Sequence, residues 1–370
     1  MSGDLIPFFV ADRPASLLIL KGVMLKHPDV KVGVMSHAFT SKNFWQMFSD
    51  YPYKLNLLYE NPYFLNEEAI LAPNLIKIAD SGVFTRNGCT IDYKELFARY
   101  NQLGVEFGVI IDILKDSNET IQSAMKGLRI YTRDKQKYHF KLIAVAQGKT
   151  MDEYLKCYEK LQQRFEYVAI GGLLKKSENS ARYVRVQDEQ FMHDVLTAIK
   201  KDFSPEWIFP LGCYHPSRHK KFEAIGVWGS DYKGWIFNYT SKIDSLKKTN
   251  KILTSFDLSN GFTNVFKNLL IHTQELETRL ANLSKKWREE KDPSTKRELR
   301  IKMNLMKSEL EKAYAALLKE RQQIARYNHL PADYKENLNN FERVVATGEQ
   351  EWRFREVRTY IEEKVYAQLR

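Results

Sequence analysis

Short apolar runs alternate with amphipathic stretches over the first two thirds of this 370-residue chain. The runs have the length of buried strands and are bounded by turn residues, whereas the stretches between them repeat apolar residues at helical spacing. This alternation predicts a parallel sheet, because parallel strands need a crossover connection that is usually a helix. The expected strands are Leu5–Val10, Lys31–Ser36, Ile76–Ser81, Phe107–Ile113, Lys141–Ala146, Tyr167–Gly171, Trp207–Leu211 and Ala224–Trp228.

Eight such strands within about 230 residues are the number expected of a closed (β/α)8 barrel, also called a TIM barrel. The expected helices between them are Tyr93–Leu103, Ser117–Gln136, Met151–Phe165 and Asp188–Lys201. A doubly wound open sheet is the alternative, but no Gly-x-Gly-x-x-Gly motif follows the first strand, as its dinucleotide-binding form would require. We therefore predict an α/β fold with a (β/α)8 barrel over residues 1–258.

The composition changes at about Ser259, where strand-like runs end and Glu, Lys, Arg and Leu dominate. Apolar residues then recur at three- and four-residue steps in two series separated by Asp292-Pro293, which reads as an N-cap followed by a proline at the first helical position. We predict a basic helical domain over residues 259–370. It contains an antiparallel helical hairpin that ends by Pro331 and a last helix that starts at Glu349. This appendage is expected to face nucleic acid or to mediate contact with a second copy or a partner subunit; a solvated helical face is the alternative.

The formal net charge of +11 fits a polyanionic partner such as nucleic acid, although a lysine-rich surface on an ordinary soluble protein is the alternative. The three cysteines are far apart, so they predict neither a disulfide framework nor a Cys-x-x-Cys metal site. The apolar run at residues 16–24 contains a lysine and is too short to span a bilayer. We expect a cytoplasmic protein with no metal, no cofactor and no membrane partner.

Acidic and amide side chains follow four of the apolar runs. In a (β/α)8 barrel the chemistry takes place at the carboxyl ends of the strands, so side chains at these positions are informative. A single aspartate there is often a helix N-cap; we expect Asp92, Asp116 and Asp188 to be caps or surface groups. Several buried carboxylates on successive junctions favour an active site, because an unpaired buried charge is costly. The candidates are Asp80, Asp112, Gln147 and Asp231, the last of which is expected just beyond the next-to-last or the last strand.

Four segments around these residues resemble the tRNA-guanine transglycosylases. They are Ala-Asp-Ser-Gly-Val-Phe at residues 79–84, Ala-Gln-Gly at 146–148, Val-Ala-Ile-Gly-Gly-Leu at 168–173 and Leu-Gly-Cys-Tyr-His-Pro at 211–216. Their order and spacing agree with the family from about Ile76 to Phe237. The resemblance implies a TIM barrel that exchanges a guanine in nucleic acid for a 7-deazaguanine.

The resemblance also implies residue roles. Asp80 matches the general acid/base, Asp231 matches the nucleophile, and Asp112 matches the aspartate that reads the N–H edge of the purine. Gln147 and the Gly171-Gly172 backbone match the groups that read its carbonyl and amino positions. The other matched residues expected to bind the substrate are Ser81, Leu173, Gly212 and Phe84, the last of which would stack on the base.

Carboxylates suit this chemistry. Cleavage of an N-glycosidic bond develops positive charge at C1′, which one carboxylate can trap as a covalent glycosyl–enzyme intermediate. A second carboxylate can take the proton of the incoming base and allow it to attack. A paired base cannot reach such a site, so the target must be flipped out or single-stranded.

Several residues depart from the family pattern. Val83 and Thr85 replace a glycine and a glutamine, the segment around Asp231 lacks the family's flanking residues, and the structural zinc cluster has no counterpart. These departures look more like the DNA-modifying branch, which inserts 7-deazaguanines such as preQ0 into DNA. The alternatives are a tRNA enzyme, a non-catalytic nucleic-acid-binding protein on a degenerate barrel, and a glycosidase that removes the base without replacing it.

A basic loop follows the seventh expected strand. Its side chains are candidates for binding phosphate groups near the site, and a solvated loop is the alternative. The residues expected to contact nucleic acid are His215, Arg218, Lys220, Lys221 and Lys233.

Overall fold

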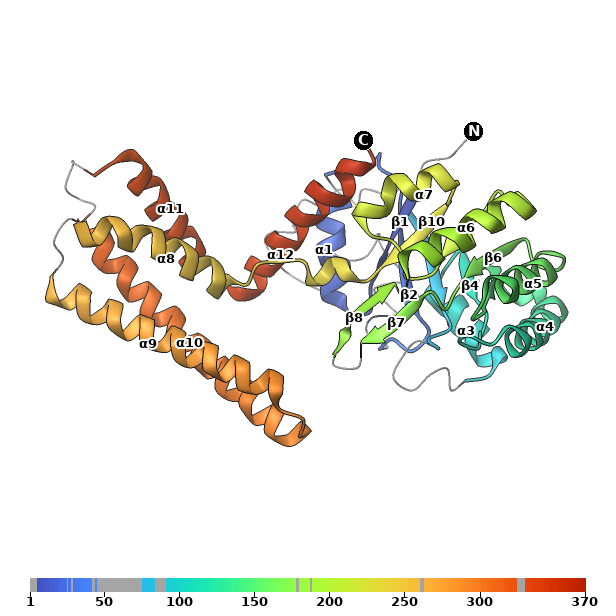
Figure 1. Ribbon diagram of the computed structural model, residues 1–370, viewed down its shortest axis with the longest axis horizontal. Coiled ribbons are helices and arrows are strands. Elements are labelled where there is room, and N and C mark those ends of the chain that lie inside the picture. The colour runs from blue at the N-terminus through green and yellow to red at the C-terminus, as the bar shows by residue number, and fades with distance from the viewer. Residues whose placement is uncertain are drawn as a thin grey trace. The chain divides into compact units, whose positions relative to one another are not determined.

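The computed structural model divides the chain into two compact units (Figure 1). Unit 1 contains Met1–Asn238 and Val357–Arg370, and unit 2 contains Tyr239–Glu356. The division therefore falls earlier than the boundary at residue 258 expected from the sequence, and the chain returns to unit 1 at its end. The structure describes residues 5–24, 26–27, 29–41, 44, 75–83, 91–177, 180–186, 188–259, 263–324 and 330–370.

Eight parallel strands of the described chain form the (β/α)8 barrel of unit 1, as the sequence predicts. They run in the order β10-β1-β2-β3-β4-β5-β6-β9. The ring closes between its two end strands, where the Trp228 N–H donates to the Ile208 carbonyl at 3.0 Å. The strands are β1 (Ile6–Val10), β2 (Val32–His37), β3 (Leu75–Asp80), β4 (Phe107–Val109), β5 (Lys141–Ala146), β6 (Tyr167–Ile170), β9 (Phe209–Pro210) and β10 (Gly229–Tyr232).

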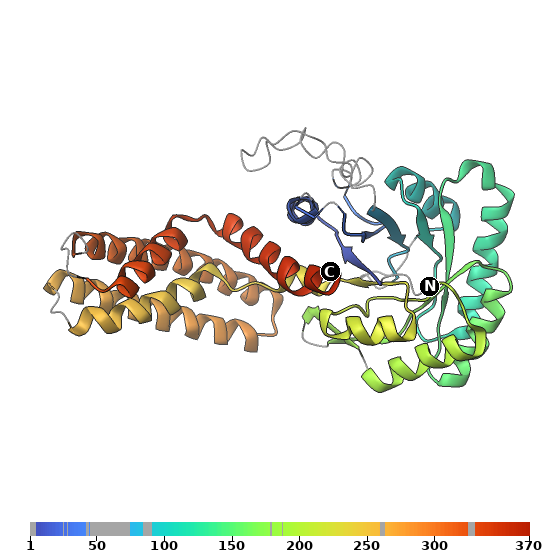
Figure 2. The ribbon, with the colours of Figure 1, turned by 90° about the horizontal axis from the view of Figure 1, so that it is seen from above.

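The helices of unit 1 lie on the outside of this sheet (Figure 2). They are α1 (Pro14–Met24), α3 (Tyr93–Leu103), α4 (Ser117–Arg133), α5 (Met151–Gln162), α6 (Glu189–Phe203) and α7 (His219–Ile225). The expected caps are confirmed: Asp92, Asp116 and Asp188 each accept backbone N–H groups in the first turn of α3, α4 and α6. An antiparallel hairpin, β7 (Leu174–Ser177) and β8 (Ser180–Val186), follows β6.

The ring of Phe8 fills the barrel interior, where its centroid lies 5.1 Å from that of Phe209. Two glycines on neighbouring strands make room for it, since a Cβ on Gly33 or Gly229 would overlap the ring. Gly33 and Asp231 are its register partners on the two adjacent strands. Register partners in a parallel sheet share a face, so Asp231 also points inward.

The last strand differs from its expected position. Residues 224–228 were expected to form it, whereas α7 continues to Ile225 and ends at Gly226, which adopts a left-handed conformation with φ of 84°. The strand itself is Gly229–Tyr232, so Asp231 lies within β10 and not beyond it. The error arose because the apolar end of a buried helix and a short strand have the same composition.

The end of the chain supplies the last helix of the barrel. Helix α12 (Glu349–Tyr360) continues into a π-helical turn, Ile361–Val365, and a 3-10 turn, Tyr366–Gln368. Within unit 1, Arg358 donates to the Leu18 carbonyl of α1 at 3.3 Å and the hydroxyls of Tyr360 and Tyr232 are 2.8 Å apart. Unit 2 therefore lies between β10 and this last helical segment in the chain.

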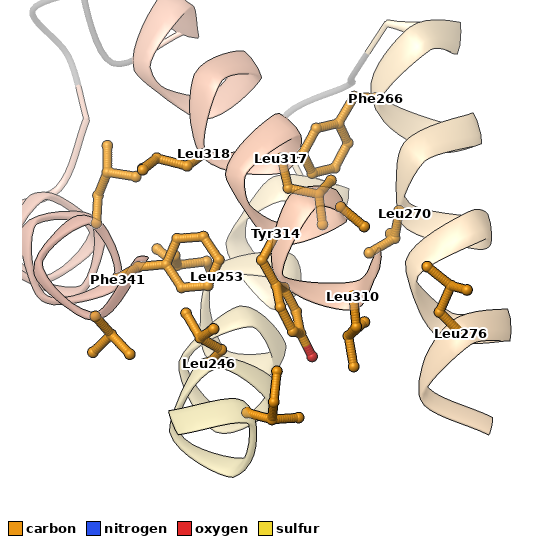
Figure 3. Close-up of a cluster of buried hydrophobic side chains, with 14 of the residues drawn as sticks. Leu246, Leu253, Phe266, Leu270, Leu276, Leu310, Tyr314, Leu317, Leu318 and Phe341 are labelled. Carbon is orange, nitrogen blue, oxygen red and sulfur yellow. The ribbon is translucent and has the colours of Figure 1, made fainter. Parts of the chain in front are cut away.

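Unit 2 is helical, and α9 and α10 form the antiparallel hairpin that the sequence predicts. Its helices are α8 (Lys242–Ser259), α9 (Asn264–Glu289), α10 (Pro293–Ile324) and α11 (Ala332–Ala346). Leu246, Leu253, Phe266, Tyr314 and Leu317 are among the side chains of its core (Figure 3). None of the described helices in either unit is long and apolar enough to cross a membrane.

A charged network is buried in the core of unit 2. The guanidinium of Arg321 donates to Asp257 at 2.9 Å, to Asn250 at 2.8 Å and to Thr254 at 3.1 Å. Tyr334 donates to the other oxygen of Asp257 at 2.8 Å. Since nearly every polar atom has a partner, the buried pair links α8, α10 and α11 without an isolated charge.

Candidate active site at the carboxyl ends of the strands

Three aspartates share one electrostatic environment at the carboxyl ends of the barrel strands. Asp80 ends β3, Asp112 follows β4 and Asp231 lies in β10. The charge of Asp80 raises the pKa of both other carboxyls. Strands β10 and β3 are separated by β1 and β2 in the sheet, so the electrostatic coupling of Asp231 to Asp80 acts across the curved sheet of the barrel.

Burial sets the titration of these carboxyls. It raises the pKa of Asp80 to about 6, against the opposing effect of the Gly82 and Ser81 N–H groups. Burial and then the charge of Asp80 raise the pKa of Asp112 to about 7. The same two causes raise the pKa of Asp231 to about 7, although the Gly212 N–H favours its ionised form. Near neutral pH the cluster therefore holds both ionised and protonated carboxyls, as combined nucleophilic and acid–base work requires.

Gln147 is fully buried and its amide is fixed from both ends. The Lys115 N–H donates to Oε1 at 3.1 Å, which leaves Nε2 to donate to Asp112 Oδ2 at 2.5 Å. The backbone of Gly171 and Gly172 packs directly on this amide, since a Cβ on Gly171 would lie 2.5 Å from Nε2. Gln147 thus orients Asp112, and the two glycines are needed for the close approach of the amide.

Asp231 is held by the loop that follows β9. The Gly212 N–H donates to its Oδ1 at 2.5 Å, and Gly212 has a φ of 72° that favours glycine. The Tyr214 N–H donates to the Asp231 carbonyl at 3.1 Å, and the Ser230 hydroxyl donates to Pro210 at 2.6 Å. Gly212, which was expected to bind substrate, therefore positions the carboxylate of Asp231.

The segment after β3 places further polar groups beside Asp80. The Gly82 N–H donates to Asp80 Oδ2 at 3.2 Å, with a φ of 83° at Gly82. Ser81 is fully buried and its hydroxyl has no hydrogen-bond partner among the described residues. Leu173 is buried at the end of β6. Phe84, the expected stacking residue, lies outside the described residues.

His37 is a polar residue at this edge that the sequence analysis missed. It ends β2 and is the register partner of Asp80, so the two share a face of the sheet. Its Nδ1 accepts the Phe39 N–H at 3.2 Å, so the neutral ring carries its hydrogen on Nε2, and burial lowers its pKa. His37 directly follows the apolar run at residues 31–36, which is the same position that singled out the aspartates and Gln147.

Of the five residues expected to contact nucleic acid, three have side chains engaged with other residues of the chain and two are exposed. Arg218 pairs with Glu189 through Nε at 2.9 Å and donates to the Cys213 carbonyl, so its charge is engaged. His215 accepts the Ser217 N–H and caps a 3-10 turn. Lys233 pairs with Asp12 at 3.2 Å. The two remaining lysines, Lys220 and Lys221, are exposed in the first turn of α7.

Among the described residues, no three His, Cys, Asp or Glu side chains are placed so as to hold a metal ion. No family model matches the sequence, and no curated protein matches it either. One similar solved structure is described as "Native KDPGal structure"; it matches with a TM-score of 0.34 and 11% identity over 64% of this chain and 85% of that chain. The fold and the site together define a (β/α)8-barrel protein with a buried carboxylate cluster at the carboxyl ends of its strands.

Proposed function

We propose that this protein is an enzyme, a base-exchange glycosyltransferase that replaces guanine in DNA with a 7-deazaguanine such as preQ0. The observation that carries the proposal is the electrostatic coupling of Asp80 to both Asp112 and Asp231. Three carboxyls with raised pKa values, two of them coupled to Asp80, would supply the nucleophile, the acid/base and the base-reading group that the reaction needs. The ordered resemblance of the surrounding segments to the transglycosylases supports the choice of substrate.

In the first displacement, the Asp231 carboxylate attacks C1′ of the target nucleotide. The C1′–N9 bond breaks, its electron pair goes to the guanine, and the protonated Asp80 supplies the proton that the leaving base takes up. The product is an ester between Asp231 and C1′. Asp80 can act as the acid because burial raises its pKa above the ordinary value, and the Gly212 N–H favours the ionised form of Asp231 that attacks.

In the second displacement, the incoming base loses its N9 proton to the Asp80 carboxylate and attacks C1′. The ester bond breaks and Asp231 returns as a carboxylate. Two inversions leave the anomeric configuration unchanged, as in retaining glycosidases. The Gly212 N–H, which donates to Asp231, holds that carboxylate in place in both steps.

Asp112 and Gln147 are the groups that would read the flipped base. An ionised Asp112 accepts the N–H groups of the guanine edge, and its Oδ2 is already held by Gln147. An amide nitrogen carries two hydrogens, so Gln147 has a second one to donate to a carbonyl of the base. An analogue that lacks these N–H groups would leave the buried carboxylate unpaired, which favours guanine-like bases.

The test is label transfer from a radioactive 7-deazaguanine into polymer. The protein is incubated with a DNA duplex or with tRNA, and each polymer is then isolated and counted; a denaturing gel shows covalent protein–DNA adducts. Incorporation into DNA is expected for the wild type and is expected to be lost in Asp231→Asn. The exposed Asp152→Asn variant is the matched control and is expected to retain activity.

The other outcomes discriminate between the alternatives. Label in tRNA alone would identify a tRNA enzyme, and abasic sites without label would identify a glycosidase. Salt-sensitive binding without adduct or label would indicate a non-catalytic barrel. An Asp231→Asn variant that incorporates label at the wild-type rate would refute the assigned nucleophile.

A further inference from the structure

The turn between α9 and α10 carries the most concentrated charge of unit 2. We call residues 285–302 the hairpin tip; they include eight basic and four acidic residues. The whole chain has 57 basic and 46 acidic residues, so this short segment contributes four of its eleven net positive charges. The basic residues are Lys285, Lys286, Arg288, Lys291, Lys296, Arg297, Arg300 and Lys302.

These cations are not neutralised by the described protein. Within the described residues none of them forms an ion pair within 4.0 Å, in contrast to Lys242, Lys247 and Arg321 elsewhere in unit 2. Two of the four carboxylates accept hydrogen bonds from backbone N–H groups of the turn. Glu290 accepts the Lys291 and Asp292 N–H groups at 2.7 and 2.8 Å, and Asp292 accepts the Thr295 N–H at 2.7 Å. The tip therefore presents an excess of positive charge to solvent.

The turn that displays these charges is bridged by contacts of its own. Lys296 lies with its Nζ 5.0 Å from the ring centroid of Trp287 and donates to the Glu290 carbonyl at 3.2 Å. This contact joins the start of α10 to the end of α9 across the turn. A surface that is already rigid loses less conformational entropy when a ligand binds to it.

Like charges also lie on one face of α10. Lys296 and Arg300 are four residues apart, and Arg297 and Arg300 are three apart, which are the spacings of neighbours on a helix surface. Like charges at these spacings destabilise a helix, and an anion that lies along the face relieves the repulsion. Duplex DNA presents phosphates at short regular intervals, so cations on successive turns can each meet one.

We propose that the hairpin tip binds the phosphate backbone of duplex DNA. The choice of DNA rests on the proposed function, whereas the surface itself is defined by its unpaired cations. Contacts of this kind hold a polymer without reading its sequence. The tip would therefore raise the affinity for DNA of any sequence and take no part in the chemistry at Asp231.

The test measures the binding of the full chain to a fluorescent DNA duplex by anisotropy, at salt concentrations between about 50 and 200 mM. Lys285, Lys286, Arg297 and Arg300 are replaced together by Ala. The control replaces Lys251, Lys267, Lys335 and Arg343 by Ala, which removes the same charge from exposed positions elsewhere in unit 2. Circular dichroism and thermal melting establish that both variants are folded. Both sets are also measured in the Asp231→Asn background, so that binding is assessed without turnover.

We expect the tip variant to bind the duplex at least about tenfold more weakly and its salt dependence to fall by roughly one unit of slope for each lost phosphate contact. The control variant is expected to change affinity less than about twofold. If the two variants lost the same affinity for DNA, the loss would reflect the net charge of the protein and not the position of the tip. That result would overturn the proposal. Unchanged DNA affinity in the tip variant would also overturn it, as would a loss confined to an RNA duplex. Binding that survives in Asp231→Asn while label incorporation fails in the wild type would refute the enzymatic proposal alone.

Discussion

Gln147 Nε2 lies 2.5 Å from Asp112 Oδ2, and this bond joins the loops that follow β5 and β4. The direction of the bond is fixed by a third group, because the Lys115 N–H must face the oxygen of the amide. Gln147 thereby favours the ionised form of Asp112, in opposition to burial. The chain thus orients this carboxylate by its own contacts.

Replacing Gln147 by Leu is expected to destabilise the protein and weaken base binding. The substitution removes the amide that donates to the buried Asp112 carboxyl, which costs about 1–3 kcal/mol. It also raises the pKa of Asp112 further, so less of the accepting form remains near neutrality. Chemical denaturation gives the free energy of unfolding, and calorimetric titration gives the affinity for guanine.

The matched control for that prediction is Gln190→Leu. Gln190 donates to Asp194 at 2.8 Å, so it makes the same kind of contact on the exposed surface of α6. Its loss should change the free energy of unfolding by less than about 0.5 kcal/mol. Equal effects of the two substitutions would show that the buried bond has no special role.

The raised pKa of Asp112 predicts that Asp112→Asn is more stable than the wild type at alkaline pH. Between the ordinary value of 3.8 and about 7, the folded protein keeps a proton that the unfolded chain has released. Wild-type stability therefore falls as the pH rises through this window, and the asparagine variant lacks that loss. The advantage is expected to be about 1–3 kcal/mol near pH 8 and to vanish near pH 4.

Urea denaturation at a series of pH values measures this difference. Asp152→Asn, which removes an exposed carboxyl, is the control. A constant difference between Asp112→Asn and the wild type across the range would contradict a raised pKa at Asp112.

Gly172→Ala is expected to disturb Asp112 indirectly, by displacing the Gln147 amide that donates to it. Gly172 has a φ of 73°, and a Cβ there would overlap the Oε1 atom of Gln147. The strained backbone costs about 1–3 kcal/mol, and displacement of the amide adds to it. Thermal melting should show a clear decrease for Gly172→Ala, whereas Gly348→Ala, whose Cβ would meet no atom within 4 Å, should melt close to the wild type.

The sequence predicted the bounds of an element correctly where short-range patterns within that element determine them. Strand β5 and helix α3 have the bounds that the sequence predicts, Lys141–Ala146 and Tyr93–Leu103. The turn between α9 and α10 was also predicted from Asp292-Pro293, since Asp292 accepts the Thr295 N–H and Pro293 starts the helix. Apolar periodicity and capping chemistry decide these features within a few residues of chain.

Features that depend on distant contacts were not predicted. The last helical segment packs on α1 through Arg358 and Leu18, and nothing in its own composition distinguishes it from the helices of unit 2. Likewise, the sequence placed Gln147 at a strand end but did not reveal that it bonds to Asp112 from the preceding junction. The pairing of β4 with β5 brings the two side chains together, and the sequence of one strand does not specify its neighbour.

Arg321→Met should destabilise unit 2 strongly, because it leaves the fully buried Asp257 without its cation. Removal of one partner of a buried pair costs about 3–5 kcal/mol. Burial already raises the pKa of Asp257 against the effect of Arg321, so the deficit should grow as the pH rises and this carboxyl ionises. Denaturation of the full chain at several pH values tests this. Arg279→Met removes an exposed ion pair with Glu275 and should cost at most about 1 kcal/mol. Similar losses at the two arginines would mean that solvent reaches Asp257 and that the buried network contributes little.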